Sequence, residues 1–506
     1  MSWSGGDWMC GVCQHINFKK REACQSCGYP KYGEPDPSTY RYNRTEALAG
    51  DWFCNCGGHN YASRSRCYKC GAVKDHYFSV YGTNSGEYGS DTLPPGWKTG
   101  DWLCPRIGCG GHNYASREEC FKCQMPRDFG SFENHIQVIA TLTDLSPTNP
   151  FFSTWNLTAP DPCSSFAGLT CTLHRVTALS LGGTSFPLAG TLPSSLSLLT
   201  DLTQLLLSPG LVTGPIPLQL AQLTNLRVLS LPSNRLTGPI PTALSTLRRL
   251  HTLDLSCNQL SGSVPPTLTD LPQLKILILA SNSLSGTLPK TVNSPLLHLD
   301  LKDNKITGPL PLSLPSSLRY LSLSQNLMWG PLPNGLQLLS ELAFLDLSMN
   351  RFSGPMPAQL FSLPALSNIF LQRNNLSGGL GSGPRTGPVP GSIVDLSHNS
   401  LSGELSSVLE GVESLFLNNN RFAGEVPEAY VKSVWRGSTR LLYLQHNYLT
   451  GIPLREGVVL PDAASLCVSY NCMVPPPAVV MTCPASAGGV VTRPAAQCSV
   501  FSHYGG

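Results

Sequence analysis

The chain has 506 residues, 19 cysteines and a formal net charge of +3. This length exceeds what one hydrophobic core usually holds, so we expect several domains. Residues 1–130 carry fifteen Lys and Arg against thirteen Asp and Glu, a balance that excludes the strongly basic surface that attracts phosphates over a distance. Because no apolar run is long enough to span a bilayer, the sequence predicts no membrane span. The start of the chain lacks the basic and apolar segments of a secretory signal, which predicts a nuclear or cytoplasmic protein.

One small pattern occurs three times in the first 123 residues: Gly-Asp-Trp, two cysteines, an Asn and a closing Cys-x-x-Cys. Trp8, Trp52 and Trp102 stand two residues before the first cysteine of each copy. The three copies contain the cysteines Cys10, Cys13, Cys24 and Cys27; Cys54, Cys56, Cys67 and Cys70; and Cys104, Cys109, Cys120 and Cys123. The spacing of the first pair differs between copies, whereas the closing pair keeps its spacing.

Four closely spaced thiolates can hold one zinc ion in a tetrahedral site that leaves no position open for catalysis. A module of about thirty residues buries too little apolar surface to fold alone, so the metal would supply its folding free energy. Disulfides are the alternative, but the tripled spacing favours zinc. We therefore expect three structural zinc ions in three small four-cysteine zinc ribbons of crossed β-hairpins, at residues 1–28, 50–71 and 100–125, joined by linkers at 29–49 and 72–99.

These modules resemble the RanBP2-type zinc finger, which has a Trp before the first cysteine, an Asn four residues after the second, and a final Cys-x-x-Cys. Asn17, Asn60 and Asn113 occupy that Asn position. Some members bind ubiquitin through a Thr-Phe pair directly after the second cysteine, and others bind single-stranded RNA. This chain has Gln-His or Gly-Gly after the second cysteine, so the resemblance implies no ubiquitin binding and a single-stranded RNA partner.

In the RNA-binding members an aromatic residue after the Asn stacks between bases, and two arginines beyond it read guanine. The resemblance therefore implies stacking by Phe18, Tyr61 and Tyr114, and guanine contacts by Lys20, Arg21, Arg64 and Arg117. Two fingers keep only one of the two arginines, which predicts a relaxed preference for guanine-containing RNA. Asp7, Asp51 and Asp101 either accept hydrogen bonds from guanine or cap the turn before each Trp. The alternative for each aromatic ring is packing on its own hairpin.

From residue 175 to about 455 the pattern changes to a repeat of about 24 residues, with leucines at fixed offsets before an Asn and a Gly-x-hydrophobic-Pro. The repeated Asn residues are Asn234, Asn258, Asn282, Asn304, Asn326, Asn350, Asn374, Asn399, Asn420 and Asn447. Such a period predicts a solenoid of about twelve coils whose stacked leucines form one core. In each coil we expect a short parallel strand with alternate side chains on a concave surface, and an Asn that satisfies backbone groups.

Residues 150–498 resemble a plant-type extracellular leucine-rich-repeat domain of receptor-like proteins, as in Leu-Thr-Gly-Pro-Ile-Pro at 236–241. The resemblance implies a right-handed solenoid at 175–455, a junction at 126–150, an N-terminal cap at 151–174 that contains Trp155, a C-terminal cap at 456–498 and a tail at 499–506. The cap cysteines are Cys163, Cys171, Cys467, Cys472, Cys483 and Cys498. They are disulfides outside the cell or thiols inside it, and the last four allow three connectivities. Asn156 and Asn375 lie in glycosylation sequons, which act only in a secreted chain.

The sequence thus predicts zinc-dependent RNA binding joined to a solenoid that binds a protein or peptide on its concave face. Exposed Arg227, Tyr320, Phe344, Phe370 and Tyr443 are the candidates there, or they are ordinary surface residues. We find no catalytic motif and expect no enzyme. Two alternatives are a receptor-like protein whose fingers come from a gene fusion or a gene-model error, and an interaction scaffold. Cys257 has no evident partner, and we expect it to be packed rather than reactive.

Overall fold

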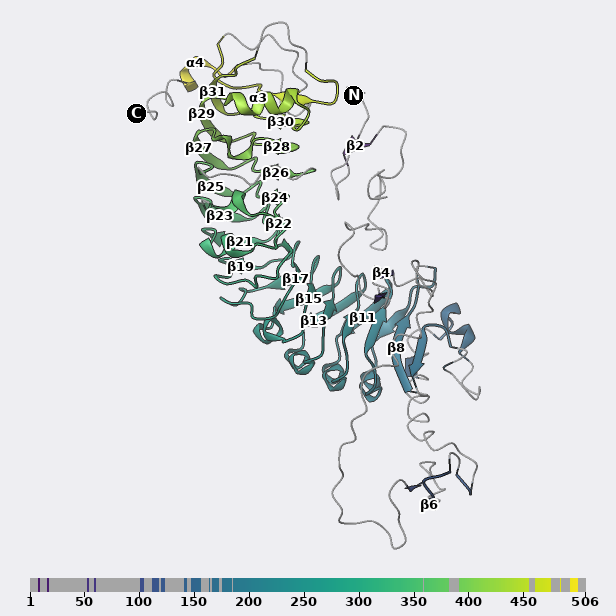
Figure 1. The fold of residues 1–506 in the computed structure, drawn as a ribbon. Helices are drawn as coiled ribbons and strands as arrows, with labels where there is room; N and C mark the ends of the chain where they lie inside the picture. The colour runs from purple at the N-terminus through teal and green to yellow at the C-terminus, as the bar shows by residue number, and fades with distance from the viewer. Residues whose placement is uncertain are drawn as a thin grey trace. The chain divides into compact units, whose positions relative to one another are not determined.

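The computed structural model describes the backbone of residues 8–9, 16–17, 52–53 and 59–60, and residues 101–103, 112–117 and 120–122. Further along it describes residues 141–142, 147–155, 163, 166–172, 175–183, 185–357, 359–381, 391–454, 460–474, 483 and 492–498. The chain divides into two compact units (Figure 1). The first comprises Met1–Ser2, Thr141–Ser153 and Leu179–Gly506, and the second comprises Trp3–Ala140 and Thr154–Ala178.

The second unit contains three antiparallel strand pairs, one in each cysteine module. They are β1 (Trp8–Met9) with β2 (Ile16–Asn17), β3 (Trp52–Phe53) with β4 (His59–Asn60), and β5 (Trp102–Leu103) with β6 (His112–Asn113). In all three pairs the Trp before the first cysteine is paired with the Asn after the second. The register of the hairpin is therefore common to the three modules.

The second unit also contains β7 (Leu169–Thr172) and the Cys163–Cys171 disulfide. Trp155 is buried and stacks on Phe166 with a centroid distance of 5.1 Å, and its Nε1–H donates to the carbonyl of Ala167. The predicted cap residues therefore lie together in one small apolar cluster closed by a disulfide.

The first unit is built from a repeated pair of short strands. One strand of each coil joins a parallel sheet, called the inner sheet here, in which neighbouring coils lie side by side (Figure 1). Its strands are β8 (Arg175–Leu181), β10 (Gln204–Leu207), β12 (Val228–Ser230), β14 (Thr252–Asp254), β16 (Ile276–Ile278), β18 (His298–Asp300), β20 (Tyr320–Ser322), β22 (Phe344–Asp346), β24 (Asn368–Phe370), β26 (Ile393–Asp395), β28 (Ser414–Phe416), β30 (Leu441–Tyr443) and β32 (Ser465–Cys467). The parallel sheet confirms the predicted solenoid type of fold.

In most coils the second strand begins directly after the repeated Asn, and these strands form two further parallel sheets. The first holds β9 (Ala189–Thr191), β11 (Leu211–Pro215), β13 (Arg235–Pro239), β15 (Gln259–Ser263) and β17 (Ser283–Ser285). The second holds β19 (Thr307–Gly308), β21 (Leu327–Gly330), β23 (Arg351–Gly354), β25 (Asn375–Gly378), β27 (Ser400–Glu404), β29 (Arg421–Glu425) and β31 (Tyr448–Gly451).

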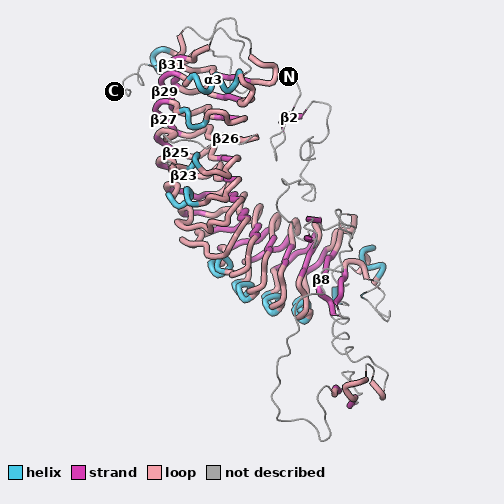
Figure 2. Tube along the Cα trace, in the orientation of Figure 1, coloured by secondary structure: helices cyan, strands magenta, loops and turns pink. Residues whose placement is uncertain are grey.

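Short helices join these strands to the next coil, as Figure 2 shows. The 3-10 helices are η3 (Pro150–Thr154), η4 (Ser194–Leu198), η5 (Leu218–Gln222), η6 (Thr242–Thr246), η7 (Pro266–Asp270), η8 (Asn334–Leu338), η9 (Leu360–Ser362) and η10 (Ser407–Leu409); the α-helices are α3 (Glu428–Trp435) and α4 (Ala495–Cys498). Pro217 and Pro241 immediately precede η5 and η6 with φ of −61°. Proline offers no N–H to a strand partner and its fixed φ suits the start of a helical turn, so the Gly-x-hydrophobic-Pro ends one element and begins the next.

The core of the first unit consists of leucines that recur once or more in each coil. The middle residue of every short inner strand is buried, as for Leu229, Leu253 and Leu345, which are 0% exposed. Burying such a side chain stabilises the fold by about 1.5–3 kcal/mol. Because one coil covers only part of its own apolar surface, this stabilisation depends on both neighbouring coils.

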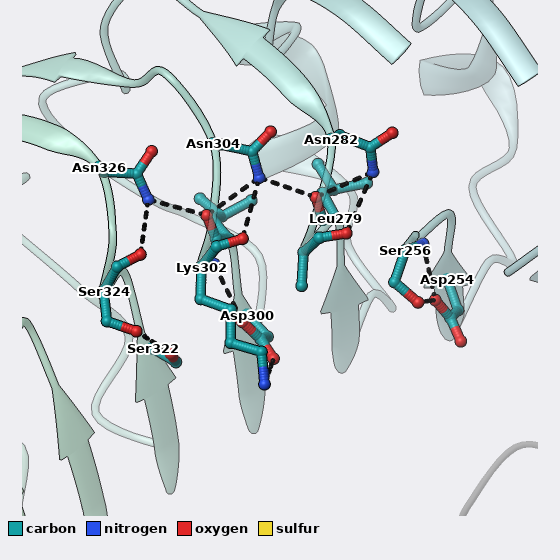
Figure 3. Close-up of polar contacts among 12 residues, drawn as sticks. Asp254, Ser256, Leu279, Asn282, Asp300, Lys302, Asn304, Ser322, Ser324 and Asn326 are labelled. Atoms are coloured by element: carbon teal, nitrogen blue, oxygen red, sulfur yellow. Dashed lines mark hydrogen bonds and ion pairs between the residues drawn. The ribbon is translucent and has the colours of Figure 1, made fainter. Parts of the chain in front are cut away.

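The repeated Asn side chains connect each coil to the one before it (Figure 3). In Asn304, Nδ2 donates to the carbonyls of Leu301 and Lys302 in its own turn at 3.1 and 3.2 Å, and to Leu279 of the preceding coil at 3.0 Å. Its Oδ1 accepts from the N–H of Leu284 at 2.9 Å. The same pattern holds at Asn258, Asn326 and Asn350, which confirms the predicted role of the Asn in satisfying the backbone.

The Asn series continues one coil beyond the range that we expected. Asn471 donates to Leu444 and Val468 and accepts from the N–H of Leu449, and β32 extends the inner sheet before it. The family resemblance implies that this stretch belongs to the C-terminal cap, because of its cysteines. The structure therefore places those two cysteines within a repeat coil.

The end of the repeat array is closed by two disulfides, Cys467–Cys483 and Cys472–Cys498. These are one of the three connectivities that the sequence left open. Arg493 contacts the same end of the array: its guanidinium lies 4.1 Å from the ring centroid of Tyr448 and 4.6 Å from that of Tyr470, and its Nε–H donates to the carbonyl of Asn447. Cation–π contacts of this kind hold the last segment on the final coils.

The residue before each repeated Asn has a left-handed backbone conformation, with φ from 52° at Ser233 to 59° at His446. Cys257 occupies this position before Asn258, with φ of 54°, and it is exposed. Our expectation that Cys257 is packed was therefore wrong, because the turn directs this side chain outward. Desolvation raises the pKa of its thiol, so the site does not favour a reactive thiolate.

Replacing one repeated Asn tests how much the stability of the coils depends on its side chain. We expect Asn304→Ala to lower the free energy of unfolding by about 3 kcal/mol or more, because several buried backbone groups lose their partners at about 1–3 kcal/mol each. Urea unfolding of the full chain measures this difference. The exposed Asn375→Ala in β25 is the matched control, with an expected change of about 0.5 kcal/mol or less. Equal effects of the two substitutions would contradict the role of the repeated Asn in stabilising the coils.

Candidate functional site

The third cysteine module is held together by two buried polar side chains. Asn113 is fully buried, and its Oδ1 accepts from the N–H of Phe121 at 2.9 Å. The side chain of Asp101 is 1% exposed; its Oδ1 accepts from the N–H of Ala115 at 2.9 Å, and its Oδ2 lies 2.9 Å from Nε2 of His112. Asn113 and Asp101 therefore link the hairpin to the turn after it and to the closing cysteine segment.

These contacts bear on the two interpretations of the aspartates. Both oxygens of Asp101 already face partners inside the module, so its geometry favours the capping role over a guanine contact. Asp7 and Asp51 lie outside the described residues, and their role stays a prediction. His112 is 37% exposed at its side chain, and its contact with Asp101 shows that it supports the turn.

The aromatic residue after the Asn lies on the surface. Tyr114 is 60% exposed, and its ring lies edge to face with the ring of His112 at a centroid distance of 5.9 Å. The N–H of Arg117 donates to the carbonyl of Tyr114 at 2.9 Å, which forms a turn with both side chains exposed. Phe121 is also 58% exposed. Sequence reasoning missed Phe121, although an aromatic-Lys pair stands between the closing cysteines of the second and third modules.

The predicted RNA-contacting residues Phe18, Lys20, Arg21, Tyr61 and Arg64 lie outside the described residues. Only one predicted zinc ligand is described: Cys120, which is 1% exposed. In the described part of the chain no group of three or more His, Cys, Asp and Glu side chains could hold a metal ion, and the other eleven predicted ligands fall outside it. A buried sulfur beside a hairpin fits a structural zinc ligand, since the thiolate is a preferred zinc donor.

On the inner sheet, aromatic rings from adjacent strands form a column. His298, Tyr320 and Phe344 are the first residues of β18, β20 and β22 and are paired in register. Their rings stack with centroid distances of 4.1 and 4.4 Å and interplanar angles of 1° and 7°. Phe370, at the end of β24, lies 5.5 Å from Phe344. Parallel pairing places the same position of each strand side by side, which brings these rings together.

The structure thus brings together three of the five residues predicted for the concave face: Tyr320, Phe344 and Phe370. Tyr443 instead contacts Phe416 edge to face at 5.3 Å. Arg227 is exposed outside the column, directly before β12. Sequence reasoning missed His298 because a histidine does not stand out in an apolar pattern, although it occupies the same offset as Tyr320.

Four aspartates follow a second pattern on the inner sheet. Asp254, Asp300, Asp346 and Asp395 are the last residues of β14, β18, β22 and β26, which are alternate strands. Asp346 Oδ1 accepts from the N–H and the hydroxyl of Ser348, and Asp254 does the same with Ser256. Asp300 lies 3.9 Å from the ammonium of Lys302. Among the described residues, Asp254, Asp346 and Asp395 form no ion pair.

Burial of this row affects its protonation. Desolvation raises the pKa of Asp254 and of Asp300, and it raises the pKa of Asp395 from 3.8 to about 6 despite hydrogen bonds from Ser397. Loss of hydration penalises the charged carboxylate, and no close cation compensates for it at Asp395. Burial therefore disfavours the charged form of these carboxylates, and a cation that approached them would favour it.

Family comparisons match both parts of the chain. Residues 98–128 match the family described as Zn-finger in Ran binding protein and others, and residues 224–284 and 292–309 match leucine-rich-repeat families. The chain contains a RanBP-type zinc finger and leucine-rich repeats. Both families consist of binding domains rather than enzymes. In the described residues no helix has the length and apolar character needed to cross a membrane.

Curated relatives match a minor share of the chain. An RNA-binding protein involved in heterochromatin assembly, dri1 of Schizosaccharomyces pombe, is 27% identical over 139 residues, which are 24% of this chain and 22% of that protein. Zinc finger Ran-binding domain-containing protein 2 of Homo sapiens is 32% identical over 84 residues, 15% of this chain and 25% of that protein. The chain therefore spans about a quarter of the length of these relatives.

A solved structure resembles the repeat part. The leucine-rich-repeat ectodomain of the plant membrane receptor kinase GASSHO1/SCHENGEN3 from Arabidopsis thaliana, in complex with CASPARIAN STRIP INTEGRITY FACTOR 2, is 29% identical with a TM-score of 0.52. The alignment covers 67% of this chain and 47% of that chain. The repeat part thus shares the fold of plant receptor ectodomains.

The raised pKa of Asp395 predicts a pH-dependent stability. Between about pH 4 and 6 the folded chain holds a proton at Asp395 that the unfolded chain releases, so the stability falls as the pH rises through this window. We expect Asp395→Asn, which keeps an oxygen to accept from Ser397, to raise the free energy of unfolding by about 1–3 kcal/mol at pH 7.5 and by about half as much at pH 5. Urea unfolding at the two pH values measures it.

Exposed Glu410→Gln is the control for this substitution, with little change expected at either pH. An equal effect of Asp395→Asn at pH 5 and pH 7.5 would show that its carboxyl does not titrate as described.

Proposed function

We propose that the N-terminal fingers bind single-stranded RNA, with zinc as the structural metal of each finger. The exposure of Tyr114 carries this proposal. Asp101 and Asn113 are used inside the finger, whereas the Tyr114 ring and the Arg117 side chain face solvent. A base can stack on an exposed ring for about 1–3 kcal/mol, and a guanidinium beside it can contact the base edge or the phosphate.

Three fingers act together in this proposal. The common Trp–Asn register of the three hairpins supports three modules of one design. In the sequence, Phe18 and Tyr61 directly follow the Asn of their modules as Tyr114 does. Joined by linkers, weak sites gain affinity because later contacts become intramolecular. With one arginine in each of the second and third fingers, stacking contributes more than base reading, and guanine preference is relaxed.

A relative supports the proposal of RNA binding, because dri1 is by its name an RNA-binding protein. Three structural zinc ions, each held by the four cysteines of one finger, would complete the folding of these modules. We place this activity in the nucleus or cytoplasm, where thiolates remain reduced.

We further propose that the inner sheet binds a peptide. The stacked rings of His298, Tyr320 and Phe344 carry this second proposal, because aligned aromatic side chains are typical of binding hot spots, and Tyr320 and Phe344 are partly exposed. The similar GASSHO1/SCHENGEN3 ectodomain was solved in complex with CASPARIAN STRIP INTEGRITY FACTOR 2, which supports a ligand-binding role for such a surface.

The RNA proposal is tested with the full chain and a labelled single-stranded RNA that contains guanines. Tyr114→Ala should weaken binding about 5- to 100-fold, since it removes one stacked base worth about 1–3 kcal/mol. Fluorescence anisotropy at low salt measures the dissociation constant, and the zinc content confirms that the finger still holds its metal.

Phe186→Ala is the matched control, because Phe186 is 43% exposed but lies outside the fingers. Unchanged affinity in Tyr114→Ala, or the absence of RNA binding by the unaltered chain at low salt, would contradict the proposal.

A further inference from the structure

The stretch of the inner sheet from β22 to β26 combines apolar side chains with two carboxylates that form no ion pair among the described residues. Asp346 ends β22, Phe370 ends β24 and Asp395 ends β26, so the two carboxylates flank the ring of Phe370. Phe344 and Ile393, at the starts of β22 and β26, are partly exposed beside them. Asp346 and Asp395 are also partly exposed, whereas Asp300 is buried beneath Lys302.

A third acceptor lies in the same stretch. Gln372 follows β24 at the offset that Ser348 and Ser397 occupy in the neighbouring coils. Its Oε1 is buried and accepts no hydrogen bond within the described part of the chain. Unsatisfied buried acceptors are rare in proteins and indicate a missing donor. This surface therefore has more acceptors than donors.

Charged groups near this surface leave it acidic. Arg319 lies 3.6 Å from Glu341, and Arg440 lies 3.4 Å from Glu413. The charge of Arg373 acts on Asp395 from beyond ion-pair distance. Arg227 and Lys275 precede β12 and β16, at the other end of the aromatic column. A cationic ligand is thus attracted to Asp346 and Asp395 rather than to the earlier strands.

The spacing of the two carboxylates sets the conformation of such a ligand. They stand two strands apart, which is about 9–10 Å at about 4.8 Å per strand. A polyproline II segment rises about 3.1 Å per residue with three residues per turn, so residues i and i+3 lie on one face about 9.3 Å apart. In a β-strand, residues i and i+3 point to opposite faces instead. The polyproline II segment therefore matches the carboxylate spacing on one side.

We propose that β22–β26 bind an extended peptide in which two Lys or Arg residues are spaced three apart in a polyproline II conformation. One cation contacts Asp346 and the other contacts Asp395, while the residues between them cover the partly exposed Phe344 and Ile393 and pass over Phe370, which is only 7% exposed. This inference rests on the proposed peptide binding by the inner sheet, and it defines the chemical class of the peptide.

The test uses the full chain and isothermal titration calorimetry with two capped hexapeptides of equal composition and charge. One is Lys-Pro-Pro-Lys-Pro-Pro, and the other is the isomer Lys-Lys-Pro-Pro-Pro-Pro. We expect the spaced peptide to bind about tenfold more tightly than the isomer, and each of Asp346→Asn and Asp395→Asn to weaken it about tenfold. Both variants keep an oxygen for the serine hydrogen bonds, so the turns are preserved.

Two controls separate this inference from the proposal on which it rests, that the inner sheet binds a peptide. Glu410→Gln, outside the surface, should leave the affinity unchanged, and Leu-Pro-Pro-Leu-Pro-Pro tests an uncharged ligand. Equal binding of the two lysine isomers, or affinities that do not respond to either Asn variant, would overturn the inference. If the leucine peptide binds instead and Phe344→Ala abolishes it, the inference fails while peptide binding by the inner sheet stands. If no peptide binds, both fail.

Discussion

The side-chain amide of the repeated Asn is the contact on which the repeat part depends. A thin coil exposes backbone N–H and C=O groups toward its neighbour, and each such group that was buried without a partner would cost about 1–3 kcal/mol. Asn304 satisfies such groups in its own coil and in the preceding one. The same bonds fix the register of the strands. Because of that register, His298, Tyr320 and Phe344 stack, and Asp346 and Asp395 flank one ring.

The finger is organised by the same principle on a smaller scale. Asn113 and Asp101 direct their polar atoms to backbone and side-chain groups inside the module, whereas the rings of Tyr114 and Phe121 are exposed. In both parts, buried Asn side chains hold the backbone in place, and the positions of the exposed aromatic rings depend on that backbone.

Much of this organisation is readable in the sequence because it depends on local periodicity. The spacing of the Asn residues predicted the coils, and the Trp, Asn and cysteine pattern predicted the finger. The coil at Asn471 was missed because its cysteines were attributed to the cap, although Leu466 keeps the core position of the inner strand. His298 was missed because stacking depends on the neighbouring strand rather than on its own residue type. The burial of Asp101 and the pairing among Cys467, Cys472, Cys483 and Cys498 depend on tertiary contacts that spacing does not specify.

We propose that one chain uses two sulfur chemistries, with zinc thiolates in the fingers and disulfides at the ends of the repeats. Alkylation of the purified chain in denaturant with a zinc chelator and no reductant, followed by mass spectrometry, tests it most directly. Of 19 cysteines, six lie in the disulfides Cys163–Cys171, Cys467–Cys483 and Cys472–Cys498, which leaves thirteen to be labelled. The account predicts thirteen labels, with those six cysteines unlabelled. Nineteen labels, or unlabelled cysteines within residues 1–123, would contradict it.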